Sequence, residues 1–110
     1  MMRKIILFSL FLSMETLANG WSGIRDIEMI QQRECSSENK GFEITFKTDH
    51  KNPDSCSNPR IVNLSCTQPG YETMVSMALT ALATGKGIDT WVAGCDSEGH
   101  ARVASMTLRP

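Results

Sequence analysis

The sequence is poor in aromatic residues and has no apolar run long enough to cross a membrane. Only 6% of its 110 residues are aromatic. Five aromatics follow residue 20, too few to fill a core and also stack the bases of a nucleic acid. The longest apolar stretch, residues 5–12, is far shorter than the roughly 20 residues of a membrane-spanning helix. We therefore expect neither a nucleic-acid partner nor a membrane span.

Blocks of like charge are also missing. The formal net charge is −1, with 11 basic and 12 acidic residues. The first 18 residues hold two basic residues and one acidic residue, which leaves 9 and 11 in the remainder, a net charge of −2. This acidic balance disfavours a polyanionic partner.

The motifs that usually carry catalysis or metal binding do not occur. There is no Gly-x-Ser-x-Gly, no His-Glu-x-x-His and no glycine-rich phosphate loop. No two cysteines form a Cys-x-x-Cys pair, and His50 and His100 have no zinc-finger spacing. The sequence therefore predicts a non-enzymatic protein with no cofactor and no metal.

The first residues have the order of a secretory signal peptide. Arg3 and Lys4 precede the apolar run, and small residues follow at Ala18 and Gly20. We predict cleavage after Ala18, with Gly20 as the alternative. The expected protein is a single domain over residues 19–110 that is secreted or periplasmic.

The four cysteines of this chain all follow the predicted signal peptide. An even number of cysteines in a short exported chain predicts two disulfides. Closing loops of 30 to 40 residues implies about 4 kcal/mol for each bridge in the chain-entropy model. Four cysteines allow three pairings, so the choice requires a topology.

Alternating apolar and polar residues predict strands. Phe42, Ile44 and Phe46 alternate with polar residues in the clearest of them. The apolar residues of the first strand fit no single alternation, which predicts a bulge or bend, and a bulge is also expected in the last strand. The expected strands cover residues 21–34, 41–47, 60–66, 88–95 and 101–109.

The segment 71–87 is the one predicted helix, ending at Gly85 as a left-handed cap. Its expected apolar stripe consists of Met74, Val75, Ala78 and Leu82. No charged residue lies between Glu72 and Lys86. The side that carries Thr73, Ser76, Met77 and Thr80 is therefore either a subunit interface or a threonine-rich solvent face.

The element order is strand, strand, strand, helix, strand, strand, as in a five-stranded OB-like barrel that is mainly β with one helix. If successive strands run up, down and up, Cys35 and Cys66 lie at one end of the barrel. Cys56 and Cys95 then lie at the other end. The crossed pairings would span the barrel, whereas a disulfide needs Cα atoms less than about 7 Å apart. We therefore predict Cys35–Cys66 and Cys56–Cys95.

Three segments also resemble a known family: NGWSGIRD at residues 19–26, MVSMALTALATGKGI at 74–88 and WVAGCD at 91–96. Together with the paired cysteines, they are similar to small exported OB-fold proteins that include the binding subunits of pertussis-type and subtilase-type AB5 toxins. The resemblance implies a ring of subunits, often five, with the helices facing a central pore. It also implies a surface that binds glycans.

Four side chains are candidates for a ligand site or interface. Trp91 is expected to face outward because Val92 faces the core, and Asp96 and His100 follow it. Trp21 is the second tryptophan. Exposed indoles stack on ligands or fill interfaces. The alternative for Trp91 is that it covers a disulfide or the end of the barrel. The alternative for His100 is that it is an exposed polar residue next to a turn.

The expected function is a glycan-recognising or cell-surface-recognising subunit of a ring-shaped homo-oligomer. The alternative is a monomeric secreted or periplasmic module that binds or inhibits a protein. An oligomer would protect the Thr73, Ser76, Met77 and Thr80 face of the helix, whereas a monomer would expose it.

Overall fold

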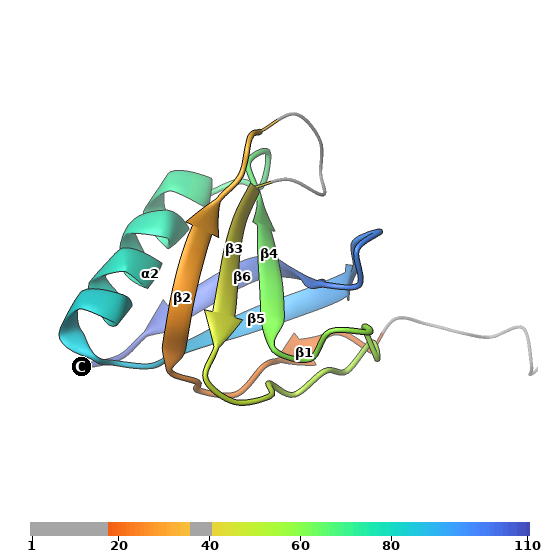
Figure 1. Cartoon of the computed structure of the whole chain (residues 1–110), viewed down its shortest axis with the longest axis horizontal. Coiled ribbons are helices and arrows are strands. Elements are labelled where there is room, and N and C mark those ends of the chain that lie inside the picture. The colour runs from red at the N-terminus through yellow and green to blue at the C-terminus, as the bar shows by residue number, and fades with distance from the viewer. Residues whose placement is uncertain (1–17, 36–40) are drawn as a thin grey trace, which may run out of the picture.

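The computed structural model describes residues 18–35 and 41–110 (Figure 1). The expected signal peptide lies almost entirely outside the described residues and stays a prediction. The described chain is mainly β with one helix, α2, which spans Tyr71–Thr84. The strands are β1 (Gly20–Trp21), β2 (Ile27–Gln32), β3 (Gly41–Phe46), β4 (Ile61–Ser65), β5 (Ile88–Cys95) and β6 (Ala101–Leu108).

The strands form one six-stranded mixed sheet in the order β1-β5-β6-β4-β3-β2. The pairing of β4 with β6 is parallel, and the other pairings are antiparallel. In Figure 1, β5 and β6 cross behind β2, β3 and β4, with α2 to one side. The sheet is strongly coiled but not closed, so the expectation of a closed five-stranded barrel was wrong.

The difference lies in the expected first strand, which is split in two. β1 pairs with β5 at one edge of the sheet, and β2 pairs with β3 at the other edge. Gly23 between them has a φ of 86°, a left-handed conformation that interrupts a strand. One isolated bridge, from Arg25 to Ile88, continues the β5 pairing. The residues expected to form one bent strand therefore supply both edges.

Two further expectations about the strands are confirmed. The pairing of β2 with β3 shifts register between Ile27 and Met29, which is the bulge expected in the first strand. In the β5–β6 hairpin, consecutive residues Trp91 and Val92 oppose Ser105 and Val103. This extra residue on β6 is the bulge expected in the last strand.

The core lies on one face of the sheet, beneath α2. The alternating residues Phe42, Ile44 and Phe46 of β3 are all buried. They are joined in one apolar cluster by buried residues of the neighbouring elements: Ile27, Cys56, Val62, Leu64, Met74, Ala78, Ala81, Ile88, Val92, Ala101 and Val103. Period-two patterning therefore locates the core face correctly.

The helix ends where the sequence predicts, because Gly85 has a φ of 72° and its N–H donates to the Ala81 carbonyl. Its buried stripe is Met74, Ala78 and Ala81, whereas Leu82 is 39% exposed. The expectation for Leu82 was wrong because the i, i+4, i+7 spacing turns residue 81, and not 82, toward the sheet.

The proposed oligomer face lies on the outer side of α2. Thr73, Ser76 and Thr80 are exposed, and Met77 is half-buried. Leu79 is also exposed on the helix. This side of α2 is accessible in the single chain.

Both expected disulfides are present. Cys35 pairs with Cys66 and Cys56 with Cys95, with Cα separations of 5.7 and 5.6 Å. Two disulfides are typical of a protein from an oxidising, extracytoplasmic compartment. Within residues 18–35 and 41–110, no helix is both long and apolar enough to span a bilayer.

Candidate functional site

The two tryptophans form a pair at the edge of the sheet. Trp21 of β1 lies directly opposite Trp91 of β5, so both side chains project from the same face. Their ring centroids are 5.3 Å apart and their planes meet at 82°, an edge-to-face contact. Trp91 is half-buried, whereas Trp21 is 43% exposed. The pair therefore presents a fixed indole to solvent.

The backbone beneath this pair is held by buried hydrogen bonds. The Thr90 hydroxyl donates to Ser22 Oγ at 2.8 Å, and the Thr90 N–H donates to the same oxygen at 3.1 Å. Both residues are fully buried. Next to them, the Gly23 N–H donates to Asp89 Oδ1 at 3.0 Å. These bonds anchor the short strand β1, which otherwise pairs over only two residues.

A second group of polar and charged side chains lies on the face of the sheet opposite the core. Glu43 of β3 points to this face because its neighbours Phe42 and Ile44 face the core. It lies opposite Asn63 of β4, which in turn lies beside Arg102 of β6. Glu43 is only 8% exposed, so this part of the outer face is covered.

Arg33 provides part of that cover. It follows β2, and its N–H donates to the Gly41 carbonyl at 2.7 Å. Its Nη1 lies 2.6 Å from Glu43 Oε2 and 2.7 Å from Glu98 Oε1. The hydrogen bonds to Glu98 and then to Glu43 raise the pKa of Arg33 above its usual value. The guanidinium therefore stays charged and joins β2, β3 and the β5–β6 turn.

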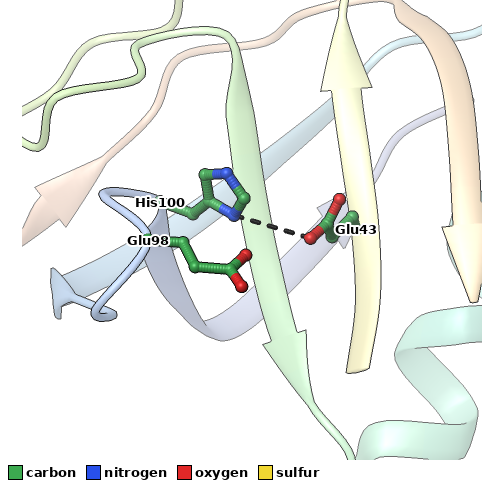
Figure 2. A group of neighbouring side chains, drawn as sticks. All are labelled: Glu43, Glu98 and His100. Atoms are coloured by element: carbon green, nitrogen blue, oxygen red, sulfur yellow. Dashed lines mark ion pairs between the residues drawn. The ribbon is translucent and has the colours of Figure 1, made fainter. Parts of the chain in front are cut away.

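The turn between β5 and β6 provides the rest of the cover, and Asp96 organises it. Asp96 Oδ1 accepts the backbone N–H groups of Glu98 and His100, each at 2.9 Å. Gly99 adopts a φ of 84°, which favours glycine. A side chain at Gly99 would clash with the Ser57 hydroxyl. In this arrangement the turn directs Glu98 and His100 toward Glu43 (Figure 2).

His100 lies between two carboxylates. Its Nδ1 is 3.7 Å from Glu43 Oε2 and 3.7 Å from Asp96 Oδ2. The His100 side chain is 10% exposed, and that of Asp96 is fully buried. Neither Nδ1 of His100 nor Oδ2 of Asp96 has a hydrogen-bond partner. We call Arg33, Glu43, Asp96, Glu98 and His100 the outer-face cluster.

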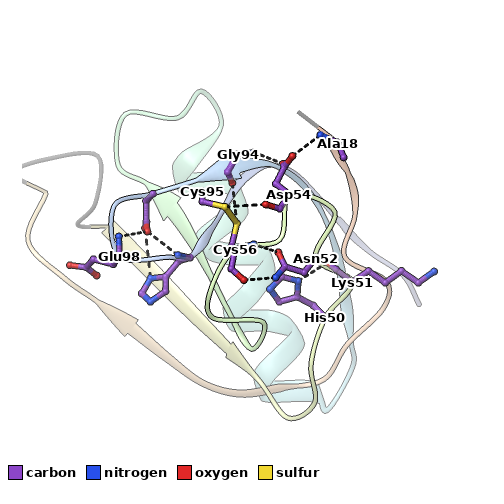
Figure 3. Close-up of a disulfide and its surroundings, with 11 residues drawn as sticks. Ala18, His50, Lys51, Asn52, Asp54, Cys56, Gly94, Cys95 and Glu98 are labelled. Carbon is purple, nitrogen blue, oxygen red and sulfur yellow. Dashed lines mark hydrogen bonds and ion pairs between the residues drawn. A yellow bond between two sulfur atoms is a disulfide. The ribbon is translucent and has the colours of Figure 1, made fainter. Parts of the chain in front are cut away.

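The Cys56–Cys95 disulfide attaches the loop before β4 to the β5–β6 hairpin, which carries Trp91, Asp96 and His100 (Figure 3). Asp54 Oδ2 accepts the Gly94 N–H at 2.7 Å, and its Oδ1 accepts the Ala18 N–H at 2.6 Å. Asn52 exchanges two hydrogen bonds with the backbone of Cys56, at 2.6 and 3.0 Å. Cys95 therefore serves the architecture and stabilises the end of β5.

The four candidates from the sequence fall into two groups. Trp21 and Trp91 pair with each other, and Asp96 and His100 belong to the outer-face cluster. Sequence reasoning missed Arg33, Glu43 and Glu98. Glu43 was assigned to a solvent face by its alternation, and no local pattern signals that residues 33 and 98 fold over it.

Three donors of the outer-face cluster have the chemistry to hold a metal ion. One carboxylate oxygen each from Glu43 and Glu98 and one ring nitrogen of His100 lie within 4.8 Å of one another. Imidazole and carboxylate are common zinc ligands.

No family model, no curated protein and no solved structure matches this chain.

Proposed function

We propose that this chain is an exported, non-enzymatic binding module that recognises a glycan through the Trp21–Trp91 pair. The observation that carries the proposal is that Trp21 is 43% exposed while Trp91 holds it edge to face at 5.3 Å. An indole fixed in this way offers a flat apolar surface to the C–H face of a sugar ring. Because its rotamer is already restricted, binding costs little side-chain entropy.

Polar groups near the pair suit a sugar as well. Asp89 precedes Trp91 by two residues, so its carboxylate lies on the same face of β5. Ser105, the cross-strand partner of Trp91, is exposed. Ligand sites commonly combine an apolar surface with a few oriented polar groups of this kind.

The fold proposed for this module is an OB-like, partly open barrel. In support, α2 connects β4 to β5, and the two halves of the expected first strand pair with β5 and with β3. The two edge strands of the described sheet, β1 and β2, are therefore consecutive in the chain.

The module is proposed to assemble into a ring through α2. Thr73, Ser76 and Thr80 are exposed on a helix that carries no charge between Glu72 and Lys86, and Leu79 is 47% exposed beside them. Small polar and apolar side chains allow two helices to approach closely without burying an unpaired charge. Native mass spectrometry of the oxidised protein tests this step, and a monomer at micromolar concentration would contradict it.

A glycan array tests the recognition step. The oxidised protein and a Met29→Ala control should be retained by the same subset of immobilised glycans, because Met29 is exposed on β2, at the opposite end of the described strand order from β1. The Trp21→Ala variant should lose that retention. Quenching of tryptophan fluorescence by the soluble glycan provides an independent measurement. No retention of the wild-type protein on any glycan would refute the proposal.

A monomeric module that binds or inhibits a protein is the second candidate. The edge strand β2 favours it, since Met29 is 52% exposed and β2 pairs on only one side within the described sheet. Edge strands accept an extended peptide as an additional strand. A monomeric mass together with no glycan retention would favour this candidate.

A further inference from the structure

We propose that Glu43, Glu98 and His100 form a binding site for a divalent cation of the zinc class. Their donor atoms lie within 4.8 Å of one another, although the residues come from β3 and from the β5–β6 turn. The site is separate from the tryptophan pair and does not depend on glycan recognition.

The donor set selects the class of cation. One imidazole nitrogen and two carboxylate oxygens are typical of zinc and its first-row neighbours, whereas calcium and magnesium take oxygen ligands. Zinc bonds to nitrogen and oxygen are about 2.0–2.2 Å long, so two donors on one ion lie up to about 4 Å apart. The 3.7 Å between His100 Nδ1 and Glu43 Oε2 is within this limit. Glu98, whose side chain is 38% exposed, has the freedom to close the remaining gap.

The imidazole nitrogen of His100 is an independent indication of a ligand. This nitrogen is buried and has no hydrogen-bond partner. Its 3.7 Å distances to Glu43 Oε2 and Asp96 Oδ2 are too long for hydrogen bonds. A buried polar atom without a partner is costly, and a cation placed between the nitrogen and the glutamates would remove that cost.

Asp96 acts as a positioning residue in this site. Its Oδ1 accepts the N–H groups of Glu98 and His100, which sets the spacing of two of the three ligands.

Arg33 competes with the cation. Its Nη1 lies 2.6 Å from Glu43 Oε2 and 2.7 Å from Glu98 Oε1, so it neutralises the same two carboxylates. The Arg33 side chain is 26% exposed and has a path to solvent. Cation binding and the two Arg33 ion pairs therefore exclude each other, and removal of the guanidinium should tighten cation binding.

Native mass spectrometry of the oxidised protein with ZnCl₂ or CaCl₂ tests the proposal. We expect one zinc ion per chain, no specific calcium adduct and a rise in melting temperature with zinc. His100→Gln and Glu98→Gln should each weaken zinc binding by more than about 10-fold, the lower bound for a lost supporting contact. Arg33→Gln should strengthen it. Glu72→Gln removes a carboxylate outside the cluster and should leave binding unchanged.

Two results would overturn the site. One is the absence of a zinc adduct on the wild-type protein. The other is a zinc adduct that persists with unchanged affinity in Glu98→Gln, a variant of an exposed side chain that is expected to fold even if His100→Gln does not. A circular dichroism spectrum of each variant establishes that loss of binding is not loss of folding.

Discussion

Replacing Cys56 and Cys95 together with alanine should destabilise the protein more than replacing Cys35 and Cys66. The bridged residues are 39 positions apart in the first pair and 31 in the second. In the chain-entropy model these loops correspond to about 3.9 and about 3.7 kcal/mol. Loop closure alone therefore predicts nearly equal losses.

The two bridges differ in how deeply their cysteines are buried. Cys56 is 6% exposed and belongs to the apolar cluster, whereas Cys35 is exposed. Truncating a buried sulfur leaves a cavity, which costs about 1–2 kcal/mol more. The Asp54 bond to Gly94 also depends on the loop staying against β5. We therefore expect a total loss of about 5–6 kcal/mol for the first pair and about 4 kcal/mol for the second.

Urea unfolding of the two double variants, followed by circular dichroism, measures both losses. A loss on this scale is comparable to the whole stability of a small domain, so the Cys56 and Cys95 variant should be mostly unfolded at 37 °C. Equal midpoints, or a lower midpoint for the Cys35 and Cys66 variant, would refute the reasoning that burial distinguishes the bridges.

Three single substitutions probe the core and the turns by the same unfolding measurement. Gly41→Ala should cost about 1–3 kcal/mol because its Cβ would clash with the Leu64 carbonyl oxygen; an unchanged midpoint would contradict this. Gly85→Ala should cost about 1–2 kcal/mol through its φ of 72° alone, since its Cβ meets no atom within 4 Å, and a larger loss would indicate an unrecognised contact. Ile44→Val should cost about 0.5–1.5 kcal/mol at its fully buried position, and no loss of stability would refute this.

The features predicted correctly from the sequence are those fixed by local chemistry. The alternation of Phe42, Ile44 and Phe46 depends only on the strand period, and the helix end depends on Gly85. The disulfide pairing followed from the element order, because three cysteines at or just after strand ends and one in the loop before β4 leave few pairings within the reach of a disulfide.

The split of the first strand depends on non-local contacts. β1 is fixed by Ser22, whose partner is Thr90 of β5, and by the Gly23 bond to Asp89. These bonds connect residues more than 60 positions apart. The sequence pattern indicated an irregular strand there but carried no information about which partner each half would choose.

The outer-face cluster was unpredictable for a related reason. Alternation correctly placed Glu43 opposite the core, and a residue opposite the core of an antiparallel pair is normally solvated. It is buried instead because Arg33 and the 96–100 turn fold over it. Only the tertiary arrangement of the two hairpins brings these charges together.

Each disulfide supports one side of this cluster. Arg33 precedes Cys35 by two residues, so the Cys35–Cys66 bridge holds the end of β2 near Glu43. On the other side, Asn58 follows Cys56 by two residues, and its N–H donates to the Gly99 carbonyl at 3.0 Å. The Cys56–Cys95 bridge therefore holds the turn that carries Glu98 and His100. Since Glu98 and His100 lie on this turn, loss of the Cys56–Cys95 bridge should weaken zinc binding. Loss of the Cys35–Cys66 bridge loosens the competing Arg33 and should not weaken it.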